Sequence, residues 1–137
     1  MELDTKNTIL LPNQDKFEKV SGGLHILGDF YGCRGGQEYM LDADLLYEFC
    51  SEQVKQAGLT EIGQSFYQFP DAGVTGTILL AESHVAIHTW PEKDYLTLDV
   101  FVCNVTQDNT EKAKKLFNAF VELFQPEDLR RQDIDRD

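Results

Sequence analysis

Long apolar runs are missing from this sequence. No stretch of the 137 residues approaches the ~20 consecutive apolar residues that a membrane-spanning helix needs. The first residues, 1–4, contain no basic region leading into an apolar run, so no secretory signal is predicted. Hydrophobic residues make up 42% and charged residues 26% of the chain, which is ordinary globular usage. A cytoplasmic globular protein with no membrane partner is therefore expected.

Basic residues are also scarce. The chain has 12 Lys and Arg against 24 Asp and Glu, which gives a formal net charge of −12. A chain this acidic repels the phosphates of nucleic acids and of anionic membranes, so neither is predicted as a partner. The same charge attracts a cationic small molecule.

Cysteine and histidine occur too rarely, and too far apart, for a metal site. Cys33, Cys50 and Cys103 are odd in number and lack C-x-x-C spacing, which argues against a disulfide framework or a zinc site. His84 and His88 would lie ~13 Å apart on a strand, too far to share one ion. No metal is expected. Pyridoxal phosphate is not expected either, because no lysine lies in an apolar stretch that would lower its pKa.

The apolar pattern predicts one domain between two polar ends. Residues 1–21 are expected to form a flexible arm, residues 22–125 the domain, and residues 126–137 a charged, frayed tail. Strands are predicted at residues 24–31, 59–69, 74–81, 85–90 and 95–103. Helices are predicted at residues 42–57, with Asp42 as N-cap, and at 108–124, with a capping box from Asp108 to Glu111.

The predicted elements indicate an α+β fold. Short connections between the last three strands favour antiparallel hairpins, because a parallel crossover needs about a dozen residues. In the strand at 95–103, apolar residues on one face should meet the helices, and Asp99 and Cys103 should lie on the other. Each helix has an apolar stripe, in the first made of Leu45, Leu46, Phe49, Cys50, Val54 and Ala57. An antiparallel sheet with two long helices on one face, a two-layer sandwich, is therefore predicted.

Residues 79–92 combine a strand-like apolar pattern with an unusual number of polar groups. They include Glu82-Ser83-His84, His88, the chain's only tryptophan and Pro91-Glu92. Such a conflict between pattern and polarity is typical of a functional site. A serine hydrolase is not supported, because Ser83 lacks the Gly-x-Ser-x-Gly elbow.

These motifs strongly resemble those of the small prokaryotic S-adenosylmethionine decarboxylases. The resemblance rests on Glu82-Ser83-His84, His88, Trp90-Pro91-Glu92 and the run from Asp99 to Cys103, and it extends over residues 23–124. One departure is Asn104, where the family commonly has glycine after the cysteine. Asparagine tolerates the left-handed conformation, so the change either affects only the turn or signals altered substrate choice.

The resemblance implies a self-processing proenzyme. Ser83 would attack the carbonyl of Glu82, and cleavage between these two residues would turn Ser83 into a pyruvoyl group. His88 would act as the base in processing, with Thr75 as a possible aid. The substrate amine would then form a Schiff base with the pyruvoyl ketone, and Cys103 would donate the proton after carbon dioxide leaves.

The resemblance also implies the substrate contacts. Glu92 would hold the ribose hydroxyls of S-adenosylmethionine. Trp90 and Phe69 would sandwich the adenine and meet the sulfonium by cation–π attraction, although core packing is an equal alternative for Phe69. The product would supply spermidine and polyamine synthesis. Two alternatives stay open: a pyruvoyl-dependent arginine or ornithine decarboxylase of the same fold, and a non-processing homologue that acts as a binding or regulatory subunit.

Strand geometry adds an expectation about assembly. On one extended strand, Ser83 and His88 would lie ~16 Å apart and on opposite faces. We therefore expect His88 to act on Ser83 of a second protomer across a two-fold interface, in a homodimer with shared active sites. The family resemblance likewise implies a dimer.

Overall fold

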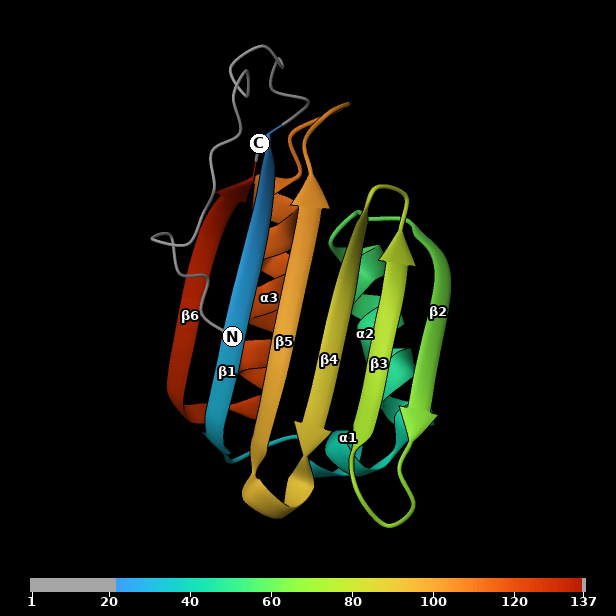
Figure 1. Ribbon diagram of the computed structural model, residues 1–137, viewed down its shortest axis with the longest axis vertical. Helices are drawn as coiled ribbons and strands as arrows, with labels where there is room; N and C mark the ends of the chain where they lie inside the picture. The colour runs from blue at the N-terminus through green and yellow to red at the C-terminus, as the bar shows by residue number, and fades with distance from the viewer. Residues whose placement is uncertain (1–21, 137) are drawn as a thin grey trace, which may run out of the picture.

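A computed structural model describes residues 22–136, so the arm expected at 1–21 lies outside the described residues. The described part is built on one six-stranded antiparallel sheet with strand order β2-β3-β4-β5-β1-β6 (Figure 1). The strands are β1 (Gly23–Cys33), β2 (Glu61–Gln68), β3 (Val74–Leu80), β4 (Ser83–Trp90), β5 (Tyr95–Cys103) and β6 (Pro126–Arg136). The helices are α1 (Gln37–Leu41), α2 (Ala43–Gln56) and α3 (Thr110–Phe124), with a short 3-10 turn, η3 (Pro91–Lys93).

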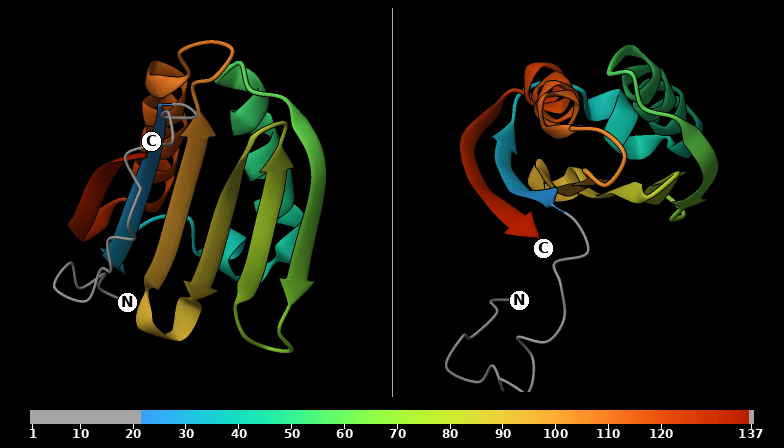
Figure 2. Two further views of the ribbon diagram at one scale, coloured as in Figure 1. Left: turned by 45° about the horizontal axis from the view of Figure 1, so that its top comes forward. Right: turned by 90° about the horizontal axis from the view of Figure 1, so that it is seen from above.

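The helices α2 and α3 cover the same face of the sheet (Figure 2). This arrangement confirms the predicted α+β fold. The predicted alternation of β5 is also confirmed, because Leu96, Leu98, Val100 and Val102 are fully buried beneath the helices. No helix covers the opposite face within the described residues, and we call it the open face. No described helix has the length and apolar character needed to cross a membrane.

The helix α2 begins as predicted. The Asp42 carboxylate accepts hydrogen bonds from the backbone N–H groups of Asp44 and Leu45, at 2.9 and 3.2 Å, and caps the helix. The placement of Leu45 in the core stripe is wrong, since this side chain is exposed. The buried positions Leu46, Cys50 and Val54 recur every four residues, and Leu45 is turned about 100° away from that row.

The helix α3 begins later than predicted. Asn109 occupies the N-cap position and Thr110 is the first helical residue, so the expected capping box from Asp108 to Glu111 is wrong. The Asp108 carboxylate instead accepts a hydrogen bond from the Thr110 N–H, at 2.9 Å. The Asn109 side chain does not cap the helix and makes a contact elsewhere, which is described with the candidate active site.

The frayed tail predicted after residue 125 is wrong. Residues 126–136 form β6, which pairs with β1 from Pro126 opposite Cys33 to Arg136 opposite Gly23. The strand was not predicted because charged residues are depleted in strands generally. They are, however, common on exposed edge strands such as β6. The guanidinium of Arg131 also lies 4.8 Å from the centre of the Phe117 ring, which ties the strand to α3.

Candidate active site

The expected cleavage site lies at the tip of a tight hairpin. The strands β3 and β4 are joined by a two-residue turn, Ala81-Glu82, and Leu80 pairs with Ser83 across it. Glu82 is exposed and Ser83 is half-buried. The bond between them is therefore the first peptide bond after the exposed turn, where β4 begins.

Ser83 and Cys103 meet at this tip although 20 residues separate them in the sequence. The backbone N–H of Cys103 donates a hydrogen bond to Ser83 Oγ, at 3.1 Å. Glu82, Ser83 and Cys103 line a cavity of about 370 Å³, together with residues of the loops before β2 and before α3. We call these three residues the cleavage end.

His88 and Thr75 lie near the other end of the same strands. They are directly paired in the β3–β4 register, and His88 Nδ1 lies 3.0 Å from Thr75 Oγ1. Both side chains belong to the open face. The strand β4 runs without a break from Ser83 to Trp90. Ser83 and His88 of one chain are therefore ~16 Å apart, and their side chains point to opposite faces of the sheet.

The expected substrate-binding residues gather at the same end as His88. The ring centres of Trp90 and Tyr95 are 5.2 Å apart, and those of Phe69 and Tyr67 are 4.9 Å apart. Phe69 is 44% exposed, so the alternative that it packs in the core is wrong. Glu92 is exposed in η3, directly after β4.

Each chain thus carries two groups of candidate residues at opposite ends of one sheet. In Figure 1 the β3–β4 hairpin lies at the top of the sheet, and the β4–β5 connection lies at the bottom. The second group, which we call the aromatic end, consists of Phe69, Thr75, His88, Trp90 and Glu92. The fold of one chain does not bring the two ends together.

The comparisons with known proteins agree with this arrangement of elements. A sequence model of the S-adenosylmethionine decarboxylase family matches residues 24–137. The chain belongs to the S-adenosylmethionine decarboxylase family. A protein of Archaeoglobus fulgidus named S-adenosylmethionine decarboxylase proenzyme is 40% identical over 114 residues, which cover 83% of this chain and 96% of that protein. A proenzyme of the same name from Aquifex aeolicus is 38% identical over 116 residues, 80% of this chain and 77% of that protein.

The fold of the family is shared as well. The crystal structure of the adenosylmethionine decarboxylase from Aquifex aeolicus matches this chain with a TM-score of 0.74 and 34% sequence identity. The match covers 87% of this chain and 92% of that one.

A histidine cluster on the open face was not predicted. His25 Nδ1 lies 3.2 Å from Arg136 Nη1, and His25 Nε2 lies 3.6 Å from Asp99 Oδ2. Burial lowers the pKa of His25, and the nearby Arg136 and His84 lower it further, while Asp99 opposes them. The cluster draws on β1, β4, β5 and β6, so no spacing in the sequence indicates it.

Asn109 is the second residue that the sequence did not reveal. Its side chain is buried beside the cleavage end, and its Nδ2 donates a hydrogen bond to the carbonyl oxygen of Cys103, at 2.8 Å. The sequence placed it inside the helix predicted at residues 108–124, so no contact with Cys103 was expected. The contact with Cys103 depends on how the loop after β5 folds.

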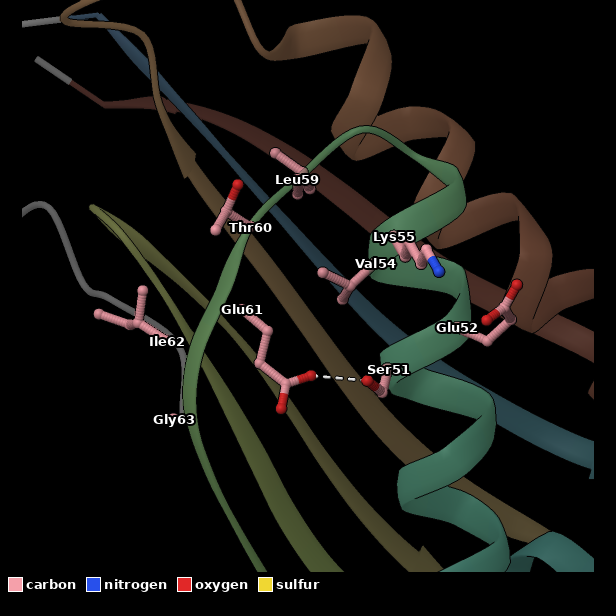
Figure 3. Close-up of a pocket in the computed structure, with 9 residues that line it drawn as sticks. All are labelled: Ser51, Glu52, Val54, Lys55, Leu59, Thr60, Glu61, Ile62 and Gly63. Atoms are coloured by element: carbon pink, nitrogen blue, oxygen red, sulfur yellow. Dashed lines mark hydrogen bonds between the residues drawn. The ribbon is translucent and has the colours of Figure 1, made fainter.

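A larger cavity, of about 680 Å³, lies between α2 and the start of β2 (Figure 3). It is lined by residues of α2, of β2 and of the loop between them, and none of the predicted site residues takes part. Leu59 and Thr60 of that loop also line the cavity at the cleavage end. The Glu61 carboxylate accepts hydrogen bonds from Ser51 Oγ and Tyr47 Oη, each at 2.7 Å. These bonds hold β2 against α2, so the Glu61 carboxylate has a structural role. No described cluster of three or more His, Cys, Asp or Glu could hold a metal ion.

Proposed function

We propose that this chain is an S-adenosylmethionine decarboxylase proenzyme that cleaves itself between Glu82 and Ser83. The curated relatives carry that enzyme's name, and they do not favour an arginine or ornithine decarboxylase. The observation that supports the cleavage site best is the contact between Cys103 N–H and Ser83 Oγ at the hairpin tip. It supports the proposal because Ser83 and Cys103, the residues to which we assign attack and proton donation, line the same cavity.

Processing at this tip would proceed in two stages. The Ser83 oxygen attacks the carbonyl carbon of Glu82, the peptide C–N bond breaks, and an ester replaces it while the amine of Ser83 is released. Removal of the Ser83 α-proton then breaks the Cβ–O bond, and Glu82 leaves as a carboxylate. Addition of water and loss of ammonia leave a pyruvoyl group at residue 83. His88 is the base that we assign to this processing.

The position of residue 83 fits such a group, because it lies at the cavity wall next to Cys103. A pyruvoyl ketone supplies an electron sink for loss of carbon dioxide from an amino acid. Cys103, on the neighbouring strand, delivers the proton to the carbon that lost the carboxylate. The short distance between Cys103 and residue 83 supports this role for the thiol.

The aromatic end would bind the substrate. Trp90 and Phe69 offer exposed ring faces to the adenine and the sulfonium. Glu92 would accept hydrogen bonds from the ribose hydroxyls. The net charge of −12 favours approach of a substrate that carries a sulfonium cation.

A homodimer would unite the two ends. The eight residues of β4 hold the cleavage end and the aromatic end about 20 Å apart, too far for one substrate-sized site. A two-fold axis through the open face would set the cleavage end of one copy against the aromatic end of the other. The open face also exposes Leu79, Tyr67 and Ile134, which a partner sheet would bury.

Intact-mass measurement of freshly expressed protein tests the proposal. Wild-type protein should yield fragments 1–82 and 83–137, and Ser83→Ala should stay a single chain. Ser65→Ala, at an exposed serine of β2, is the matched control and should cleave normally. Processed protein should release labelled carbon dioxide from S-adenosylmethionine but not from arginine or ornithine. A wild-type chain that stays intact would contradict the proposed enzyme and favour a non-processing binding or regulatory subunit.

A further inference from the structure

The residue at the N-cap of α3 does not cap its helix. Asparagine is favoured at this position because its side-chain oxygen can accept a backbone N–H of the first turn. Asn109 makes no such bond, and the Asp108 carboxylate takes the Thr110 N–H instead. The Asn109 side chain is turned back toward Cys103, where it is 9% exposed. Helix capping therefore does not explain this residue.

Asn109 reaches Cys103 just beyond the end of the β4–β5 pairing. The β4–β5 pairing ends with His84 opposite Phe101. Beyond that pair, the N–H of Cys103 donates to Ser83 Oγ at 3.1 Å, and its carbonyl accepts from Asn109 Nδ2 at 2.8 Å. In a strand, the N–H and C=O of one residue point to the same side. Two side chains, those of Ser83 and Asn109, thus bond the Cys103 backbone on the side that faces β4.

Asn109 is itself held by the residue that departs from the family pattern. Asn104 Oδ1 accepts a hydrogen bond from the Asn109 N–H at 2.7 Å, and Asn104 Nδ2 donates to Thr110 Oγ1 at 3.2 Å. A glycine at position 104 could make neither bond. The two asparagines close the loop between β5 and α3 onto Cys103.

The stability of the fold alone does not explain why one polar atom of Asn109 is buried without a hydrogen-bond partner. Among the described residues, its Oδ1 is buried and has no hydrogen-bond partner. Buried acceptors are nearly always paired in folded proteins, and exceptions cluster where a site has another requirement. Asn109 lines the same cavity as Glu82 and Ser83. The side chain that carries this unpaired oxygen is the same one that donates a hydrogen bond to the Cys103 carbonyl.

We propose that Asn109 is a positioning residue for both Ser83 and Cys103, and that Asn104 holds it in place. The inference rests on the proposed function. Asn109 fixes the Cys103 carbonyl, and so it fixes the N–H that points at Ser83 Oγ and the direction of the thiol. The N–H donor holds the Ser83 oxygen in place and stabilises the negative charge that this oxygen carries once its proton is removed. Misplacement of reacting groups by about 1 Å can slow a reaction by about 100-fold.

The test compares Asn109→Leu, which keeps the branched shape of the side chain but loses the donor, with Gln107→Ala as control. Gln107 lines the same cavity and is exposed. Cleavage is followed by intact mass after cell-free synthesis, and kcat and KM are measured per cleaved chain. We expect Asn109→Leu to cleave about 10- to 100-fold more slowly and to lose kcat at an unchanged KM. Gln107→Ala should behave as wild type in both measurements.

Position 104 provides a second, milder pair of variants. Asn104→Asp keeps the oxygen that accepts the Asn109 N–H and should cleave at close to the wild-type rate, whereas Asn104→Gly should be slowed severalfold. The pair also keeps the proposal testable if Asn109→Leu does not fold. Equal cleavage rates for Asn104→Asp, Asn104→Gly and wild type overturn it, and so does wild-type kcat in Asn109→Leu. A wild-type chain that never cleaves overturns the proposed function first, so the two failures are distinguishable.

Discussion

His88 and Thr75 form a hydrogen-bonded pair on the open face, with 3.0 Å between His88 Nδ1 and Thr75 Oγ1. A neutral imidazole has one N–H and one acceptor nitrogen. If Nδ1–H donates to Thr75, the Nε2 atom is left as the acceptor, and it can take up a proton. In that tautomer, the threonine oxygen would hold the imidazole ring in place while Nε2 acts as the processing base.

Removal of the Thr75 hydroxyl should therefore slow processing. We expect Thr75→Val to cleave about 10-fold more slowly, a fraction of the 100- to 10,000-fold that a positioned base supplies. Thr75→Ser, which keeps the hydroxyl, should cleave normally. The control is Thr77→Val, which loses a hydrogen bond to the Val85 carbonyl on the same strand pair. A wild-type cleavage rate in Thr75→Val, followed by intact mass, would show that the pair has no part in processing.

A shared active site predicts complementation between two inactive chains. Ser83→Ala and His88→Ala should each stay uncleaved alone. Folded together, a mixed dimer has one site with both Ser83 and His88, so about half of the His88→Ala chains should cleave under random pairing. Mass tags distinguish the two chains. If no His88→Ala chain is cleaved in the mixture, His88 does not act across the interface.

Substrate binding can be measured separately from processing, because Trp90 is the chain's only tryptophan. Addition of S-adenosylmethionine to uncleaved Ser83→Ala protein should change the tryptophan fluorescence. A Glu92→Gln change in that background should weaken binding about 10-fold or more, since it removes hydrogen bonds to a charged group. Glu111→Gln, on the exposed surface of α3, is the control. Unchanged affinity in the Glu92 variant would remove this residue from the site.

The half-buried His25 predicts a dependence of stability on pH. Burial lowers its folded-state pKa below the ordinary value of 6.5, so between these two values the unfolded chain binds more protons than the folded one. The stabilisation from a neutral His25 is complete above about pH 6.5 and is lost as the pH falls toward the folded-state pKa. Urea midpoints at pH 7.5 and 5.5 should drop less for His25→Gln than for wild type. Equal drops would contradict the lowered pKa.

The strand β6 should contribute to stability. Arg131 contacts the Phe117 ring and also binds Asp133, with 2.7 Å between Arg131 Nε and Asp133 Oδ1. Arg131→Ala should lower the free energy of unfolding by about 1 kcal/mol, measured by urea denaturation. Gln132→Ala, at the next and exposed position, should change it little. If Arg131→Ala is as stable as wild type, the packing of β6 on α3 is not a source of stability.

Local sequence patterns predicted features that depend only on neighbouring residues or on a regular spacing of apolar residues. The strand β5 was predicted at its observed bounds, because its residues alternate strictly between apolar and mixed faces. The N-cap of α2 was predicted because capping involves only neighbouring residues. The strand β6 was missed because Leu129 and Ile134 are its only large apolar residues. Its stability comes from pairing with β1, about 100 residues away in the sequence.

The sequence alone determined the family, and it is also the source of the proposed reacting groups, because the motif around Ser83 and the cysteine at 103 is read directly from residue order. Only the tertiary structure decided which groups meet. Antiparallel register sets Thr75 beside His88 and ends the β4 pairing before Cys103, which leaves Ser83 and Asn109 to complete it. Register depends on turn length and on which face is buried, and the buried face is a property of the whole sheet.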